Sequence, residues 1–285
     1  YLWRFYKYIW KEKRNYEAVF VHMNQIYVIL GWVIWKLLNK KIGLWYVHRK
    51  VNLRLRIAEK LTDEIFTVAQ ESFQLKSRKV NIDGHGIDIE SFMCEKPRKI
   101  SDIISILYVG RITPIKNVDT LVKAAKILKE KWDKNFRITF IGAPITKDDE
   151  KYFKNLQGMV SSMNLQNNIF FLGSIPNKNI KSYYCQADIS VNMSPTGGVD
   201  KSVLESMASK TLVLVSNKAF LNYFRRYSNQ LIFKENDSED LAYKIDNILI
   251  FKEKEDMRSF LHNKVSEMAD VKKLVRSIIL KLKNV

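Results

Sequence analysis

One segment of the sequence reads Ser105-Ile-Leu-Tyr-Val-Gly-Arg-Ile-Thr-Pro-Ile-Lys-Asn117. Its first five residues form a mostly apolar run that ends at Gly110, which is typical of a strand buried in a parallel sheet. Beyond the loop, apolar side chains recur at helical spacing from Val118 to Trp132. A buried strand followed by an amphipathic helix is the repeating unit of an α/β fold.

The same alternation extends in both directions from this segment. Downstream it predicts further strands and helices, namely strands at 137–141, 169–172, 187–192, 211–215 and 230–233 and helices at 149–163, 177–186, 202–209 and 238–250. Upstream it predicts, more weakly, strands at 18–22, 42–48 and 64–68 and helices at 25–38 and 53–61. Six strand–helix units make a complete doubly wound domain, whereas three strands are too few for one.

These patterns predict an α/β protein with two doubly wound, Rossmann-like domains. We expect residues 1–97 to form an incomplete N-terminal domain and residues 98–250 to form a complete second domain. A boundary is expected at 95–101, where Pro97 lies in a charged run. Residues 251–285 are expected to be helices that cross back to the first domain. Because the chain starts at Tyr1 without Met, we also expect it to be N-terminally incomplete.

The composition favours a folded protein without a zinc site, a disulfide framework or a membrane-spanning segment. The chain has 285 residues, of which 46% are hydrophobic, so it can bury a core and is not a disordered basic tail. Its two cysteines, Cys94 and Cys185, have no His or Cys at zinc spacing, so we expect neither a disulfide framework nor a zinc site, and a reducing compartment. The longest apolar run, 26–35, is too short to span a bilayer.

Positive charge is concentrated at the start of the chain. The whole sequence has a formal net charge of +18, and residues 1–60 carry thirteen Lys and Arg against three Glu, a net charge of +10, interleaved with aromatic residues. Such a mixture favours an anionic membrane surface as partner. The plainer alternative is a set of solvated helix faces over an aromatic core. Nucleic acid is not expected as a partner, because no recognition motif accompanies the charge.

Ligands of doubly wound sheets bind at the carboxyl ends of the strands, so the loops that follow strands are the candidate sites. Arg111 offers a planar fork for phosphate oxygens and Lys116 a compact charge, a pairing suited to a diphosphate; the alternative is a loop with solvated charges. His48 follows another strand and could contact substrate, although a lone His there is more often structural.

A second candidate loop covers residues 194–205. Gly197 and Gly198 allow the backbone to approach a ligand closely, and the helix that follows presents free N–H groups to an anion. Glu205, one to two turns into that helix, could accept hydrogen bonds from both hydroxyls of a ribose. The alternative is a surface Glu beside an ordinary glycine turn.

Several segments together resemble one family, the retaining glycosyltransferases of family 4 (glycosyl transferases group 1), which have the GT-B fold. The segments are Gly84-x-Gly-Ile-Asp88-x-x-x-Phe92, Gly110-Arg-x-x-Pro-x-Lys-Asn117, Ile141-Gly142, Phe171-Leu-Gly173, Tyr184-x-x-Ala187-Asp188, and residues 194–205 followed by Ser206-Met207-Ala208. The resemblance covers about residues 16–250. It implies transfer of a sugar, of hexosyl type, from a nucleotide-diphosphate-sugar donor with retention of configuration, without a metal or other cofactor.

The resemblance also implies roles for individual residues. The first domain would be the acceptor side and the second would bind the donor. His48, Arg111 and Lys116 would be catalytic and Glu205 would bind the ribose. The donor diphosphate would contact Arg111, Lys116, Gly197 and Gly198, and the transferred sugar Gly197, Gly198, Val199 and Asp200.

The sequence departs from the family at one position, since Gly197 stands where the family has the first Glu of its Glu-x7-Glu motif. We therefore keep two hypotheses of function. The first is a glycosyltransferase at the cytoplasmic face of the membrane, acting on a lipid-linked or polysaccharide acceptor in cell-envelope polysaccharide biosynthesis. The second is a non-catalytic subunit of a glycosyltransferase complex that binds the nucleotide sugar.

Overall fold

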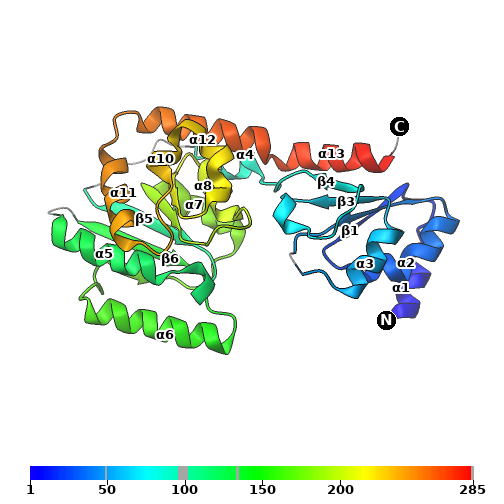
Figure 1. Cartoon of the computed structure of the whole chain (residues 1–285), viewed down its shortest axis with the longest axis horizontal. Helices are drawn as coiled ribbons and strands as arrows, with labels where there is room; N and C mark the ends of the chain where they lie inside the picture. Colours follow the sequence, from blue (N-terminus) through cyan, green and yellow to red (C-terminus); the bar gives the residue numbers. More distant parts are fainter. Residues whose placement is uncertain (49, 96–101, 133–134, 284–285) are drawn as a thin grey trace. The chain divides into compact units, whose positions relative to one another are not determined.

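The structure, a computed structural model, describes residues 1–48, 50–95, 102–132 and 135–283. It divides into two compact units. Unit 1 comprises residues Tyr1–Gly86 and the C-terminal residues from Val271, and unit 2 comprises Ile87–Asp270. Each unit is built on its own parallel sheet, as the sequence predicts (Figure 1).

Unit 1 has a four-stranded parallel sheet with the strand order β1-β2-β3-β4. Its strands are β1 (Ala18–His22), β2 (Lys41–Trp45), β3 (Glu64–Thr67) and β4 (Val80–Ile82). Its helices are α1 (Leu2–Lys11), α2 (Ile26–Leu37), α3 (Leu53–Leu61) and α13 (Val271–Lys283), with the short 3-10 helix η1 (Gln70–Ser72).

Two hydrophobic clusters hold unit 1 together. In one, side chains of α1, α2 and α3, among them Trp35 and Leu55, pack with Leu44 of β2. In the other, Ile278 and Leu282 of α13 pack with strand residues that include Phe66. Alternate residues of a strand point to opposite faces of a sheet, so these clusters cover both faces and α13 completes the unit. The last helix of the chain therefore belongs to the first unit.

Unit 2 has a five-stranded parallel sheet with the order β7-β6-β5-β8-β9. Its strands are β5 (Ile104–Val109), β6 (Phe136–Ile141), β7 (Ile169–Phe171), β8 (Ile189–Asn192) and β9 (Leu212–Val215). Its helices are α4 (Ile89–Phe92), α5 (Asp119–Lys131), α6 (Lys147–Ser162), α7 (Asn177–Gln186), α8 (Lys201–Ala208), α9 (Leu221–Phe224), α10 (Ser228–Leu231), α11 (Ser238–Ile250) and α12 (Lys254–Met268), with 3-10 helices η2 (Pro114–Lys116), η3 (Lys218–Phe220) and η4 (Arg225–Tyr227).

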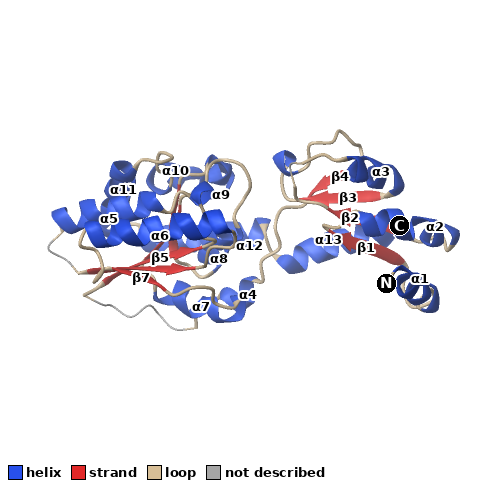
Figure 2. Ribbon diagram, turned by 90° about the horizontal axis from the view of Figure 1, so that it is seen from below, coloured by secondary structure: helices blue, strands red, loops and turns tan. Residues whose placement is uncertain are grey.

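The order of the strands in unit 2 determines where a ligand site can form. The chain runs outward from β5 to β6 and β7, then returns to place β8 and β9 on the other side of β5. Figure 2 shows α5 and α11 over one face of this sheet and α4 and α7 over the other. The loops after β5 and β8 follow the strands at this reversal, which is the place where doubly wound folds bind ligands.

One expected strand is wrong and two elements of unit 1 were not predicted. Residues 230–233 form no strand of the sheet, because 228–231 are helical in α10 and Ile232 makes only an isolated bridge to Val215. Their apolar character serves burial, since Leu231 and Phe233 lie in the core. The expected six strands are thus five. In unit 1 the sequence pattern did not predict β4, which is only three residues long, or α1.

The units divide earlier than the expected boundary. The division lies between Gly86 and Ile87, because Ile87, Ile89 and Phe92 pack into the core of unit 2. Residues 96–101, which include Pro97, lie outside the described part of the chain. Of the C-terminal helices, α12 belongs to unit 2 and α13 to unit 1.

The expectation for the cysteines was also wrong. Cys94 and Cys185 form a disulfide between residues 91 positions apart in the sequence. Local spacing gives no sign of this pair, because the fold alone brings Cys94 beside the end of α7. A bridge of this length stabilises a fold mainly by restricting the unfolded chain.

Candidate functional site

The two loops at the strand reversal of unit 2 meet through Lys116. Its Nζ donates hydrogen bonds to Ser194 Oγ at 2.9 Å and to Asp200 Oδ1 at 2.8 Å. The same loop turns through Asn117, whose φ of 48° is left-handed and whose side chain donates to the carbonyl of Met193 at 3.4 Å. The structure therefore brings together the two loops predicted separately from the sequence.

Arg111 is the second cation of this edge. Its side chain is exposed and has no hydrogen bond or ion pair within the described residues. A hydrogen bond fixes its backbone, because the Tyr108 hydroxyl donates to the Arg111 carbonyl at 2.8 Å. Burial, and then the charge of Asp200, raises the pKa of Tyr108 well above its usual value, so this phenol stays protonated and remains a donor. Arg111 thus combines a fixed backbone with a guanidinium available to an anion.

Gly142 allows the loops after β5 and β6 to approach each other closely. Its φ is +139°, and an added Cβ would lie 1.8 Å from the Gly110 carbonyl oxygen. The Gly110 N–H donates to the Ile141 carbonyl at 2.9 Å, which continues the pairing of the two strands into the loops. Only glycine satisfies both the dihedral angle and the spacing at this position.

Asp200 occupies an unusual position for a carboxylate. It precedes α8 as its N-cap residue but makes no capping hydrogen bond with its side chain. One oxygen binds Lys116, and the other, Oδ2, is buried without a hydrogen-bond partner in the described part of the chain. The ammonium group expected to bind a diphosphate is therefore paired with a carboxylate of the protein itself.

Asn217, just after β9, holds the glycine loop in place. Its Nδ2 donates to the Gly198 carbonyl at 2.7 Å, and its Oδ1 accepts from the N–H of Gly197 at 3.4 Å. Asn217 is fully buried, so its side chain is held in one place beneath the glycine loop. The sequence analysis did not single out Asn217. The feature of the sequence that could have identified Asn217 is its position just after the segment that forms β9, at the carboxyl end of a strand next to β8.

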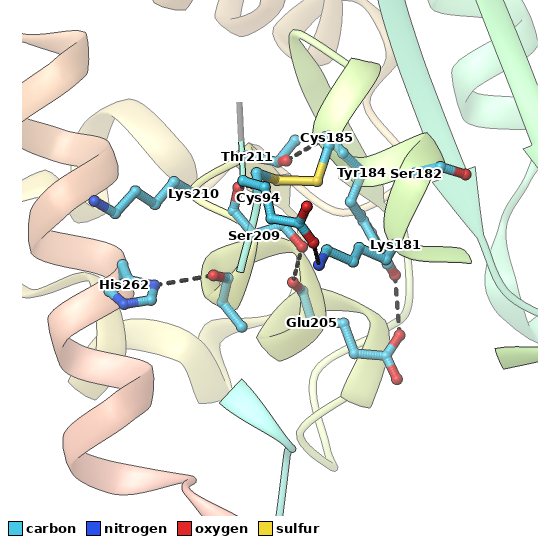
Figure 3. Close-up of a disulfide and its surroundings, with 12 residues drawn as sticks. Cys94, Lys181, Ser182, Tyr184, Cys185, Glu205, Ser209, Lys210, Thr211 and His262 are labelled. Atoms are coloured by element: carbon cyan, nitrogen blue, oxygen red, sulfur yellow. Dashed lines mark hydrogen bonds and ion pairs between the residues drawn. A yellow bond between two sulfur atoms is a disulfide. The ribbon is translucent and has the colours of Figure 1, made fainter. Parts of the chain in front are cut away.

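Glu205 lies on the buried side of α8. Asn177 Nδ2 donates to its Oε1 at 3.1 Å and the Tyr184 hydroxyl to its Oε2 at 3.2 Å. Burial raises the pKa of Glu205, against the lowering effect of these two hydrogen bonds. Figure 3 shows Tyr184 beside Cys185, which carries the disulfide to Cys94. Sequence analysis placed Glu205 on the helix but did not identify Asn177 and Tyr184 as the side chains that orient it.

The remaining predicted residues are His48 and Val199. His48 is exposed, three residues after β2 in unit 1, and its ring centroid lies 6.4 Å from that of Tyr46. Val199 packs, half-buried, against the core of unit 2. The roles predicted for both residues stay predictions.

Neither a metal site nor a membrane-spanning helix is found among the described residues. No group of three or more His, Cys, Asp and Glu side chains in this part of the chain is arranged to hold a metal ion. No helix among the same residues is both long and apolar enough to cross a membrane.

Comparison with known sequences identifies a family and a curated relative. The family described as "Glycosyl transferases group 1" matches residues 92–262. The GPI3 subunit of phosphatidylinositol N-acetylglucosaminyltransferase from Saccharomyces cerevisiae is 24% identical over 177 residues. That match covers 61% of this chain and 37% of the relative, so the match spans little more than a third of the yeast protein's length.

Comparison with solved structures identifies proteins with the same fold. Anabaena Alr3699/HepE, in complex with UDP and glucose, aligns over 98% of this chain and 80% of its own, with a TM-score of 0.78 and 15% identity. A glycosyltransferase from Rickettsia africae aligns over 98% of this chain and 78% of its own, with a TM-score of 0.79 and 17% identity. The C-terminal domain of LpcC, a glycosyl transferase group 1 family protein from Francisella tularensis, aligns over all of its length and 65% of this chain, with a TM-score of 0.57 and 25% identity.

Proposed function

The chain belongs to the glycosyl transferases group 1 family and has the GT-B fold, and from that premise we propose that it transfers a hexose from a nucleotide-diphosphate-sugar donor, with retention of configuration, to a lipid-linked or polysaccharide acceptor. The observation that carries the proposal is the contact of Lys116 with Ser194 and Asp200 at the strand reversal of unit 2, with Arg111 exposed on the same loop.

In the proposed reaction the two cations hold the donor diphosphate. Arg111 pairs with phosphate oxygens through two parallel N–H groups, and Lys116 contributes a point charge. As the bond to the sugar breaks, negative charge grows on the departing phosphate, and cations already in place stabilise it without reorganising. His48 of unit 1 is proposed as a third catalytic residue, and Glu205, oriented by Asn177 and Tyr184, would accept hydrogen bonds from the ribose.

The transferred sugar would lie against residues 197–200. Because Gly197 carries no carboxylate, the backbone of Gly197 and Gly198 and the side chains of Val199 and Asp200 would make the contacts. Asn217 supports this assignment, since it fixes the backbone of both glycines. We propose UDP as the nucleotide portion of the donor, because HepE, which shares the fold, binds UDP and glucose.

Isothermal titration with UDP, GDP and ADP tests the proposal. We expect selective binding of UDP, and loss of that binding when Arg111 and Lys116 are both changed to Ala. A matched control replaces Lys126 and Arg137, two other cations of unit 2, and should bind as the wild type does. Unchanged affinity in the Arg111/Lys116 variant would remove the diphosphate assignment.

A second function is favoured by Gly197, which lacks the carboxylate of the family motif. Under this alternative the chain is a non-catalytic subunit that binds a nucleotide sugar. The yeast relative is itself described as a subunit. Transfer of labelled sugar to extracted membrane lipids or glycans, measured with a sample that binds nucleotide, distinguishes the two functions. Any transfer that is lost in the Lys116→Ala variant excludes the non-catalytic one.

We further propose that unit 1 rests on an anionic membrane surface at the cytoplasmic face. In α1, Trp3 is 75% and Trp10 51% exposed, and the ammonium groups of Lys7 and Lys13 lie 5.6 and 3.9 Å from their ring centroids. Basic residues beside exposed aromatic rings suit anionic headgroups. Sedimentation with vesicles that contain anionic lipid should fall when Trp3 and Trp10 become Ser, whereas Leu53→Ser, a control in α3 at a side chain that is 73% exposed, should have no effect.

A further inference from the structure

A pocket of about 230 Å³ lies on unit 2 between α10 and α11. None of the residues that line it belongs to the loops of the candidate donor site. Its volume is below the roughly 300–1,000 Å³ typical of sites for drug-sized ligands, so it suits a single ring. Its lining combines aromatic, aliphatic and uncharged polar side chains.

Three primary amides dominate the polar part of the lining. They are Asn229 and Gln230 of α10 and Asn247 of α11. Asn247 donates one hydrogen bond, to the Tyr243 carbonyl at 2.8 Å. Among the described residues that line the pocket there is no carboxylate and a single cation, Lys244, which donates to the backbone carbonyl of Asn229. Amide groups that both donate and accept suit hydroxyl groups, which also do both, better than they suit a charged group.

Gln230 is the residue that points most directly to a ligand. Its Oε1 is buried, and no donor reaches it from the residues that the structure describes. A buried acceptor without a donor lowers the stability of the folded protein, because it has lost its hydrogen bond to water without replacement. Native proteins keep few such groups, and those that persist require an explanation such as a functional role. Because protein atoms cover this oxygen, a hydroxyl group bound in the pocket would provide that donor once the Gln230 amide rotates toward it.

The apolar part of the pocket suits the faces of a sugar ring. Ile248 and Phe251 supply apolar surface, and Tyr243 is 63% exposed. An exposed aromatic side chain offers a large flat surface with a polar hydroxyl at its edge. Saccharides have this same combination, with C–H groups on the ring faces and hydroxyls around the rim.

We propose that this pocket binds a neutral saccharide unit at a site separate from the donor site. Tyr243 lies against the ring, and the amides of Asn229, Gln230 and Asn247 bind its hydroxyls. The proposal rests on the proposed function in one respect: a glycan acceptor of the transferase would supply the saccharide unit. That unit would be bound on unit 2, at residues other than the loops that follow the strands. Saccharide binding itself requires no transfer activity.

Ligand-observed NMR of the full chain with glucose, galactose, N-acetylglucosamine, maltose and cellobiose tests the proposal. We expect binding of at least one sugar, weakened roughly tenfold or more by Tyr243→Ala and by Gln230→Leu. Tyr243→Phe, which keeps the ring, should retain most of the affinity. Ile250→Ala, a control at an exposed residue of the same helix outside the pocket, should bind as the wild type does.

The Gln230→Leu variant gives a second readout. Because Leu leaves no buried acceptor unpaired, this variant should unfold at the same or a higher temperature while losing the sugar. Absence of binding by all five sugars, or binding equal in wild type and both weakened variants, would overturn the proposal. UDP titration of the same samples keeps the two proposals distinguishable, since nucleotide binding should be unaffected by any change in this pocket.

Discussion

Replacement of Asp200 by Asn should strengthen the binding of UDP. The carboxylate oxygen of Asp200 lies 2.8 Å from Lys116 Nζ, so a phosphate that reaches this ammonium must share it with a negative charge. Asn keeps the size and shape of the side chain and removes the charge. UDP is the appropriate probe because it lacks the sugar that Asp200 is proposed to contact.

The expected gain follows from the geometry. Two oxygens that each lie 2.8 Å from one ammonium, at a tetrahedral angle, are about 4.6 Å apart, and two unit negative charges at that distance repel by about 3.6 kcal/mol at an effective dielectric constant of 20. The Lys116 and Asp200 side chains are 20% and 26% exposed, so we halve the value for screening by solvent. About 1.8 kcal/mol remains, or roughly a 20-fold increase in affinity.

Isothermal titration of the wild type and of the Asp200→Asn variant measures the change directly. The gain should shrink as salt is added, because the repulsion that it removes is screened. Lys123→Ala is a suitable control, since Lys123 also forms a 2.8 Å ion pair, with Asp119, on α5. Equal or weaker UDP binding by Asp200→Asn would refute the reasoning that Asp200 competes with the phosphate.

Three further predictions concern stability. Cys94→Ser should lower the free energy of unfolding by about 4.6 kcal/mol, the chain-entropy value for a closed loop of this length, as measured by urea denaturation; equal stability would mean that Cys94 and Cys185 are not bridged. Burial raises the pKa of Glu205, so its ionisation favours the unfolded state increasingly over the pH range above the usual pKa of about 4.5. Glu205→Gln should therefore gain stability relative to the wild type over that range, and a constant difference would contradict the assignment. Gly142→Ala should cost about 3 kcal/mol, seen as a lower unfolding temperature, because of its positive φ and the overlap with the Gly110 carbonyl; an unchanged temperature would disprove the close approach.

Local pattern was sufficient for most of the fold. The helices α3, α7 and α11 begin and end at the predicted residues, because their apolar spacing and end residues agree with the tertiary structure. The hydrophobic pattern gave a wrong prediction at 230–233. These residues are apolar because they are buried in a short helix and an isolated bridge, and such a run looks like that of a buried strand. The predicted resemblance to the group 1 glycosyltransferases of the GT-B fold is confirmed.

The contacts in the candidate site could not be predicted from local sequence pattern. Sequence motifs placed Arg111 and Lys116 in one loop and residues 194–205 in another, but the pairing of Lys116 with Asp200 joins positions 84 residues apart. No spacing rule predicts this contact. The same holds for Asn217, whose function is to support the glycine loop from a different strand end.

By itself, the amino-acid sequence determined most of the strands and helices, the family, and the cationic and glycine-rich loops, because each depends on residues close together along the chain. Tertiary structure alone decided the partners: the disulfide, the position of α13 in unit 1, the hydrogen bonds that orient Glu205, and the carboxylate on Lys116. These depend on the order of the strands in each sheet, which brings distant loops to one edge, and that order is a property of the whole folded chain.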